Sequence, residues 1–215
     1  MSVKNSLLSV FFMVLVSHVC AQNNPGNPRV GAQPDGSILV PTNQLLQPAG
    51  FQVCLPGRPV DLAFIPDRGF LAVKNRNSLD LIRISDRTIL QSLPFPGSGS
   101  SFKGIAYSGK SRSIYLSDAK DRILIANLGE DHTMRWKQPS TGGVPFPGGI
   151  ALNDAEDKIF VTLNRSNSLA VISLADTSIF EIPVGIAPYD VLLKSGSKAY
   201  VSNWGGRRPK AGEPT

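Results

Sequence analysis

Short runs of hydrophobic residues alternate with polar turns from Phe51 onward, and the same arrangement returns about every 40–45 residues. Each unit opens with a turn containing Gly or Pro and continues with short apolar strands. Four hydrophobic residues hold the same place in successive units, at spacings of 43, 45 and 40 residues: Val73, Leu116, Val161 and Val201. A second set repeats at spacings of 44 and 46: Leu81, Ile125 and Val171. A period of this length with several short strands is typical of propeller blades.

The composition of these runs favours strands over helices. β-branched residues and Leu dominate Leu79–Ile84 and Leu169–Leu174, and no helical spacing extends over a long window. A small sheet with two apolar faces buries both of them only against neighbouring sheets, which favours closure into a ring. The sequence therefore predicts an all-β fold, a β-propeller of four-stranded blades. A solenoid of β units is the alternative, although its coils are usually shorter.

The repeats lie near residues 51–90, 91–138, 139–180 and 181–215, and the fourth is short of strands. It stops after its second strand, at Tyr200–Asn203, and a loop-like run (WGGRRPKAGEPT) follows. A sheet that ends early leaves an unpaired edge. We therefore expect an incomplete propeller, about three and a half blades of seven, in a polypeptide that naturally continues beyond Thr215. Association of two such halves is the alternative.

The first 21 residues have the features of a cleavable signal peptide. Lys4 supplies a positive charge, Leu7–Val16 is an apolar run too short to span a bilayer, and Val19 and Ala21 are small residues at a cleavage site. We expect cleavage after Ala21 and a periplasmic or secreted protein without a transmembrane span. An uncleaved anchor and a lipoprotein attached at Cys20 are the alternatives.

Residues 22–36 carry turn formers and almost nothing apolar, which indicates a flexible lead-in before the propeller region at 37–215. The short strand expected at Ser37–Pro41 would complete the last blade from the N-terminal side. Cleavage leaves Cys54 as the one cysteine, so an intramolecular disulfide is excluded. Since Cys54 lies in the apolar run Phe51–Leu55, we expect it to be buried.

Charge and residue inventory exclude several classes of function. The net charge is +6, but Lys and Arg are scattered and few aromatic residues lie among them, so nucleic acid is not the expected partner. After cleavage His132 is the one histidine, and it lies in a polar segment without a nucleophile motif. We therefore expect no metal site, no cofactor and no catalytic residue in this chain.

Ligand-binding residues are expected where the innermost strands begin, because these strand ends line one mouth of a propeller channel. The candidates are Arg58, Asp61, Lys103, Tyr189, Asp190, Asn203 and Trp204. The alternative for the residues that end each second strand is turn formation through bonds to their own backbone: Asn75, Asp118, Asn164 and Asn203. For Trp204 the favoured alternative is side-chain packing between blades.

Two sets of residues carry a resemblance to known families. Gly185, Pro188–Asp190 and Tyr200–Asn203, with a second copy at Pro59, Asp61 and Leu71–Asn75, resemble YVTN-type β-propeller repeats, which are WD40-like. The motifs VSNWGGRRP at Val201–Pro209 and GRPVDL at Gly57–Leu62 look like the N-terminal propeller of bacterial proteins in which a phosphoesterase domain of the alkaline-phosphatase superfamily follows.

This resemblance implies an exported binding or scaffold module whose partners are the remaining blades and a C-terminal catalytic domain. None of that family's catalytic positions exists in this chain. A fragment of a stand-alone propeller enzyme, such as a lactonase, is the alternative, and self-association is a further expectation.

Overall fold

The computed structural model describes residues 29–97, 99–141, 143–194 and 198–212, and these residues form strands and turns without a helix. No segment of that part of the chain is therefore a helix long and apolar enough to cross a bilayer. The chain divides into two compact units, Met1–Val53 and Cys54–Thr215.

The first unit holds one small antiparallel sheet in the order β1-β2-β3, made of β1 (Gly31–Ala32), β2 (Ile38–Leu39) and β3 (Leu45–Leu46). The strand predicted at Ser37–Pro41 is present as β2. It pairs with β1 and β3 and does not add to a blade, because the turn formers on either side fold the chain back onto it.

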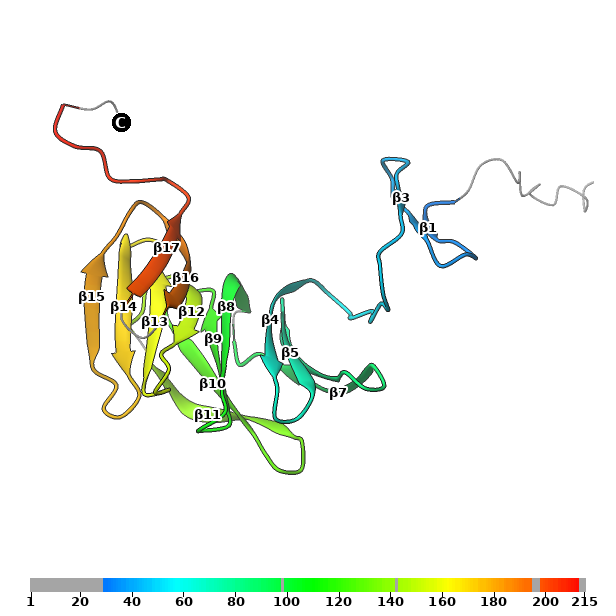
Figure 1. The fold of residues 1–215 in the computed structure, drawn as a ribbon, viewed down its shortest axis with the longest axis horizontal. Coiled ribbons are helices and arrows are strands. Elements are labelled where there is room, and N and C mark those ends of the chain that lie inside the picture. The colour runs from blue at the N-terminus through cyan, green and yellow to red at the C-terminus, as the bar shows by residue number, and fades with distance from the viewer. Residues whose placement is uncertain (1–28, 98, 142, 195–197, 213–215) are drawn as a thin grey trace, which may run out of the picture. The chain divides into compact units, whose positions relative to one another are not determined.

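The second unit contains four antiparallel sheets that follow the order of the chain (Figure 1). The first is β4 (Pro59–Ile65), β5 (Phe70–Asn75), β6 (Ser78–Arg83) and β7 (Thr88–Pro94). The second is β8 (Ser100–Ser108), β9 (Ser113–Asp118), β10 (Ile123–Leu128) and β11 (Met134–Thr141). The third is β12 (Pro147–Leu152), β13 (Lys158–Leu163), β14 (Ser168–Ser173) and β15 (Ile179–Pro183), and the fourth pairs β16 (Pro188–Lys194) with β17 (Lys198–Asn203).

Each sheet presents its first strand to its neighbours, so that β4, β8, β12 and β16 lie side by side. The pairing register confirms the repeat found in the sequence. The four equivalent positions in the second strands each face an apolar residue of the first strand: Leu62 with Val73, Ile105 with Leu116, Ile150 with Val161, and Val191 with Val201. These four sheets are hereafter called blades 1 to 4.

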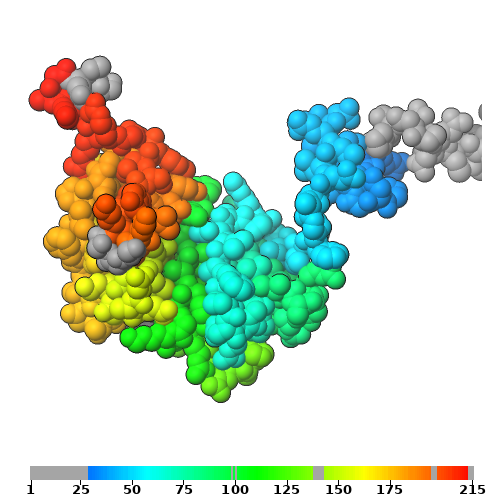
Figure 2. All heavy atoms as spheres, in the orientation of Figure 1, coloured from blue at the N-terminus to red at the C-terminus, as the bar shows by residue number. Residues whose placement is uncertain are grey.

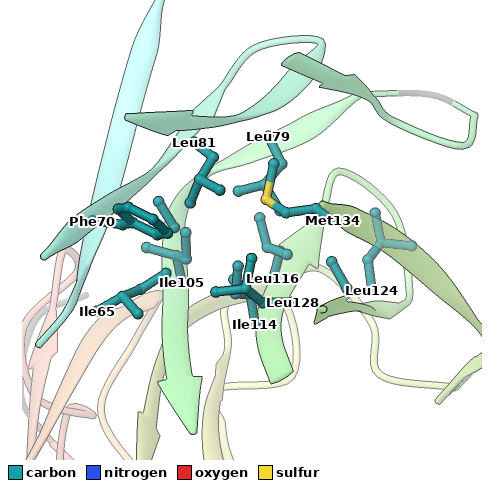
Figure 3. Packing of buried hydrophobic residues seen from close by; sticks show 12 residues of the cluster. Ile65, Phe70, Leu79, Leu81, Ile105, Ile114, Leu116, Leu124, Leu128 and Met134 are labelled. Carbon is teal, nitrogen blue, oxygen red and sulfur yellow. The ribbon is translucent and has the colours of Figure 1, made fainter. Parts of the chain in front are cut away.

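The core lies between adjacent blades, and their surfaces are in contact along the chain order (Figure 2). Ile65, Phe70 and Leu81 of blade 1 pack against Ile105 and Leu116 of blade 2 (Figure 3). A second cluster joins blade 2 to blade 3 in the same way. The prediction that each sheet buries its faces against neighbouring sheets is confirmed for these two interfaces.

The prediction that Cys54 is buried is wrong. Cys54 is exposed, and so is Phe51 of the same apolar run. The run precedes β4 as a segment without strand pairing, so no sheet face covers it.

Candidate ligand-binding site

A pocket of about 330 Å³ opens where the innermost strands of blades 2, 3 and 4 begin. Its lining is largely apolar and aromatic, and it consists of Ser101, Phe102, Lys103, Asp118, Ala119, Phe146, Pro147, Gly148, Asn164, Pro188, Tyr189 and Trp204. The structure thus brings three of the sequence-predicted site residues into one pocket: Lys103, Tyr189 and Trp204. Phe102 and Phe146 were not among the predicted residues, although Phe102 is the third residue of β8 and Phe146 directly precedes β12.

Two aromatic side chains of blade 4 form one wall of this pocket. The rings of Tyr189 and Trp204 are stacked, with centroids 4.5 Å apart and an angle of 19° between their planes. Trp204 is 69% exposed, so the expectation that it packs between blades is wrong. Its backbone N–H donates to the carbonyl of Ala187, which turns the chain after β17 back over the start of β16 and places the indole beside Tyr189.

Guanidinium groups cover the other two aromatic rings. Arg58 lies over Phe102 at 5.7 Å from the ring centroid, and Arg165 lies over Phe146 at 4.1 Å. Such stacking adds attraction between the cation and the ring quadrupole. Arg58 therefore contributes to the site through Phe102, and Arg165 is a residue that the sequence reasoning missed. Its place two residues after the second strand of blade 3 was the available signal.

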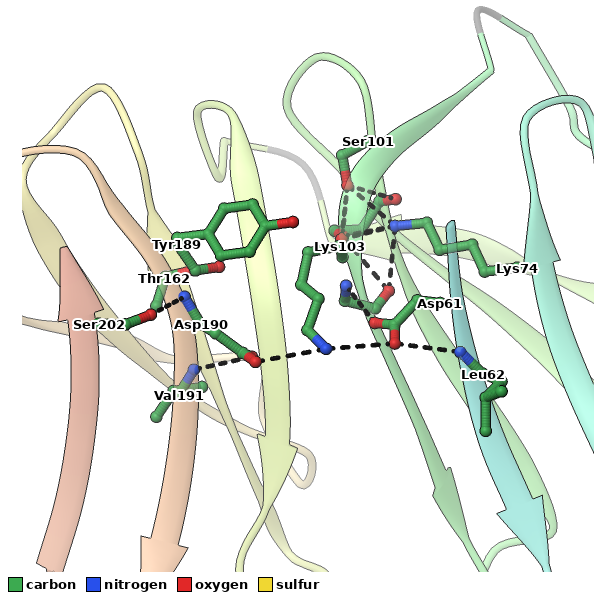
Figure 4. Close-up of polar contacts among 12 residues, drawn as sticks. Asp61, Leu62, Lys74, Ser101, Lys103, Thr162, Tyr189, Asp190, Val191 and Ser202 are labelled. Carbon is green, nitrogen blue, oxygen red and sulfur yellow. Dashed lines mark hydrogen bonds and ion pairs between the residues drawn. The ribbon is translucent and has the colours of Figure 1, made fainter. Parts of the chain in front are cut away.

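Lys103 joins three blades at this mouth. Its Nζ lies 3.3 Å from Asp61 Oδ1 of blade 1 and 3.3 Å from Asp190 Oδ2 of blade 4 (Figure 4). Although partial burial works against the charged form, the two carboxylates raise the pKa of Lys103 above its usual value. The two aspartates also accept from the backbone N–H of the residue that follows each of them, Leu62 and Val191.

Glycines of blade 3 make room for this bridge. A Cβ at Gly149 would lie 2.7 Å from Cα of Asp190 and still closer to its carboxylate, and a Cβ at Gly148 would lie 2.9 Å from the carbonyl oxygen of Tyr189. Side chains at these two positions would push β16 away from β12. The absence of side chains on Gly148 and Gly149 therefore lets Asp190 approach Lys103, which belongs to a blade that is not its sequence neighbour.

The residues that end the second strands behave partly as the turn-former alternative predicts. Asp118 Oδ1 accepts from the backbone N–H groups of the turn that follows it, residues 120–122. Asn75 accepts from the N–H of Arg58 and Arg76. Asn164 instead donates to the carbonyl of Pro188 in the next blade. Asn203 lies against Gly185 and donates to the carbonyl of Val201, and it is not among the residues that line the pocket.

Lys74 is a polar residue of this region that the sequence reasoning did not single out. Its side chain is fully buried at the end of β5, and its Nζ donates to the carbonyls of Lys103 and Gly104 at 2.7 and 3.1 Å and to the hydroxyls of Ser101 and Ser117 at 2.9 Å each (Figure 4). Burial lowers the pKa of this ammonium to about 7, against the opposing effect of the nearby carboxylates of Asp61 and Asp118.

Comparison of equivalent positions in the four repeats would have singled out Lys74. Its equivalents in blades 2, 3 and 4 are Ser117, Thr162 and Ser202, so the only long side chain at this position is the lysine. Thr162 donates to the carbonyl of Tyr189 just as Lys74 donates to that of Lys103. In blades 1 and 3 the position therefore connects one blade to the first strand of the next, whereas Ser117 donates to carbonyls of β8 in its own blade.

Within the described ranges no group of three or more His, Cys, Asp and Glu side chains is arranged to hold a metal ion. His132 is exposed in the turn before β11, where its ring contacts Phe70 edge-on and lies 3.3 Å from an Arg68 nitrogen.

Solved structures with a similar fold include β-propellers. A functionally unknown protein from Desulfotomaculum acetoxidans DSM 771 has a TM-score of 0.60 and 16% identity over 67% of this chain and 49% of that chain. The WD40 repeats of RRP9 have a TM-score of 0.53 and 18% identity, over 64% of this chain and 42% of that chain. Streptogramin B lyase has a TM-score of 0.51 and 18% identity, over 83% of this chain and 65% of that chain.

The chain thus spans about half of the length of these structures, and the likeness shows the fold alone. No protein-family model matches the sequence, and no curated protein matches it. The sheet topology and the WD40 and lyase structures together establish a β-propeller module.

Proposed function

We propose that this propeller module binds a small ligand at its channel mouth, with a flat apolar part of the ligand against the aromatic rings and an anionic group near the arginines. The observation that carries the proposal is the pocket of about 330 Å³ beside the stacked pair Tyr189 and Trp204. Concave, mostly apolar sites with a few polar groups are the usual form of small-molecule sites.

The charges around the rings favour an anion over a cation. An aromatic cage alone would suit a quaternary ammonium, but Arg58 and Arg165 already lie over two of the rings. In the described part of the chain neither guanidinium forms an ion pair with a carboxylate, whereas Asp118 is paired with Arg122 and Lys103 with two aspartates. The guanidinium donors are thus the free positive groups of the site.

Calorimetric titration with three probes tests this proposal. The probes are 2-naphthoate, its neutral counterpart 2-naphthylmethanol, and cyclohexanecarboxylate, which keeps the charge and loses the flat ring. We expect 2-naphthoate to bind with a Kd at least about tenfold below that of either other probe, because only it satisfies both the rings and the arginines.

Variants separate the two contributions. Trp204→Ala should raise the Kd for 2-naphthoate at least about tenfold, and Arg165→Gln should weaken 2-naphthoate without changing the neutral alcohol. Phe180→Ala is the matched control, because Phe180 is an exposed aromatic residue on outer strand β15. Binding of 2-naphthoate that is unaffected by Trp204→Ala, or no binding at millimolar concentration, would contradict the proposal.

We also propose that the chain is exported and serves as the propeller part of a longer phosphoesterase-like protein. The charge of Lys4, the apolar run Leu7–Val16 and the residues at Val19 and Ala21 support export, although all of them lie outside the described residues. The motif at Val201–Pro209 supports the phosphoesterase parent through its resemblance alone. The catalytic chemistry would then reside outside this chain.

One isolation experiment tests both parts of this second proposal. The protein is recovered from the extracytoplasmic fraction of the producing cell with an antibody to the propeller, and we expect its N-terminal residue to be Gln22. The phosphoesterase parent predicts a mass well above the 23.1 kDa of this chain. An intact Met1 on cytoplasmic protein would refute export, and recovery only of species no larger than 23.1 kDa would refute the longer parent.

A further inference from the structure

Equivalent residues of the four blades differ sharply in exposure. Ile105, Ile150 and Val191, which occupy the same register position of blades 2, 3 and 4, are 8%, 7% and 7% exposed. Leu62 holds this position in blade 1 and is 58% exposed. The face of blade 1 that carries Leu62 and Phe64, here called the leading face, thus has the composition of a blade interface, and among the described residues no other blade packs against it.

Blade 4 has exposed apolar residues on the other face of its sheet, the one that does not carry Val191. Leu192 and Tyr200 are cross-strand partners there and are 68% and 53% exposed. Together with Asp190 and Ser202 they line a shallow groove over β16 and β17. This surface, here called the trailing face, corresponds to the face of blade 1 that packs against blade 2.

The polar groups of the trailing face also match those that connect blades elsewhere in the molecule. Asp61 Oδ2 accepts from the N–H of Gly104 in the next blade at 2.8 Å, and Asp190 is its equivalent in blade 4. Thr162 donates to the next blade, and Ser202 is its equivalent. Within the described residues the Ser202 hydroxyl accepts from the N–H of Asp190 and donates to no acceptor.

We propose that copies of this chain dock head to tail, with the leading face of one copy against the trailing face of another. The contact would continue the interface already formed three times within the chain, with Leu62 and Phe64 covering Leu192 and Tyr200. Asp190 would accept from the backbone of β4 in the second copy. Two copies supply eight sheets, which is within the range of closed propellers, so the closed dimer is the expected product.

Sedimentation and light scattering on the purified chain test this docking at chain concentrations from about 1 to about 100 μM, a range in which a specific interface is expected to associate. We expect a dimer, and Leu62→Asp or Leu192→Asp should each weaken association about 100-fold by placing a charge in an apolar contact. Phe180→Asp is the control: Phe180 is as exposed as Leu192 but lies on β15, outside both faces, and its substitution should leave the dimer intact.

Mixing the two defective variants gives the decisive result. A mixture of Leu62→Asp and Leu192→Asp chains can form one contact between two unaltered faces, so it should yield heterodimers although neither variant dimerises alone. Three results would each overturn the proposal. They are a wild-type chain that is still a monomer at about 100 μM, a dimer that survives Leu62→Asp, and a mixture of the two variants that stays monomeric. In the first case the two faces would be left to sheets of another segment or protein.

Discussion

The Gly104→Ala variant should lose about 3 kcal/mol or more of its free energy of unfolding, and its Tm should fall by about 6–12 °C. Gly104 has φ +101°, a backbone conformation that L side chains rarely adopt. A Cβ there would also lie well inside van der Waals contact with the carbonyl oxygen of Gly148 and with the Ser117 hydroxyl. Both effects act where blade 2 meets blade 3.

A second glycine variant separates backbone strain from the close approach. Gly69 has φ +64° in the turn between β4 and β5, and no atom lies within 4 Å of a Cβ built there. Gly69→Ala should therefore cost only about 1 kcal/mol, because the backbone term acts alone. Thermal and urea unfolding of both variants measure the difference. Equal destabilisation of the two would show that β8 and β12 do not approach as closely as Gly104 and Gly148 indicate.

The sequence predicts the strands and their register well because the repeat supplies independent copies of one pattern. Val73, Leu116, Val161 and Val201 were aligned from spacing alone, and each faces an apolar first-strand residue in the structure. Periodicity determines which residues share a sheet face. The same periodicity showed where the innermost strands begin. The candidates chosen there included Lys103, Tyr189 and Trp204, which line one pocket in the structure.

The sequence did not predict contacts between blades that are not neighbours along the chain. The bridge from Lys103 to Asp190 depends on the curvature of three blades and on the missing side chains at Gly148 and Gly149. Trp204 was among the candidate ligand-binding residues, but packing between blades was favoured for it because large aromatic residues are usually buried. The turn after β17 instead directs it to the pocket.

Lys74 shows how an exception within the repeat can be more informative than the repeat itself. A lysine that replaces a hydroxyl residue extends across the interface and reaches four acceptors of blade 2. The charged groups that act on its ammonium are Asp61 from β4, Asp118 from β9 and Lys103 from β8. Removing the ammonium would leave the carbonyls of Lys103 and Gly104 with fewer donors, at a cost of about 1–3 kcal/mol.

The contribution of Lys74 to stability should depend on pH. Because burial lowers its pKa in the folded chain from 10.5 to about 7, the unfolded chain binds one proton more between these two values. The free energy of unfolding should therefore rise with pH in this window, by about 1.4 kcal/mol per unit from this group. Below pH 7 both states are protonated and the dependence should vanish.

The measurement compares the wild-type chain with Lys74→Met, which keeps most of the side-chain volume and removes the ammonium. In urea unfolding, the stability of the wild type relative to Lys74→Met should increase by about 2–3 kcal/mol from pH 7 to pH 9 and stay constant from about pH 5.5 to 6.5. Lys110→Met removes an exposed ammonium instead and should give a difference that does not change over this range. A pH-independent difference for Lys74→Met would mean that its four acceptors outweigh the cost of burial and keep the ammonium charged throughout.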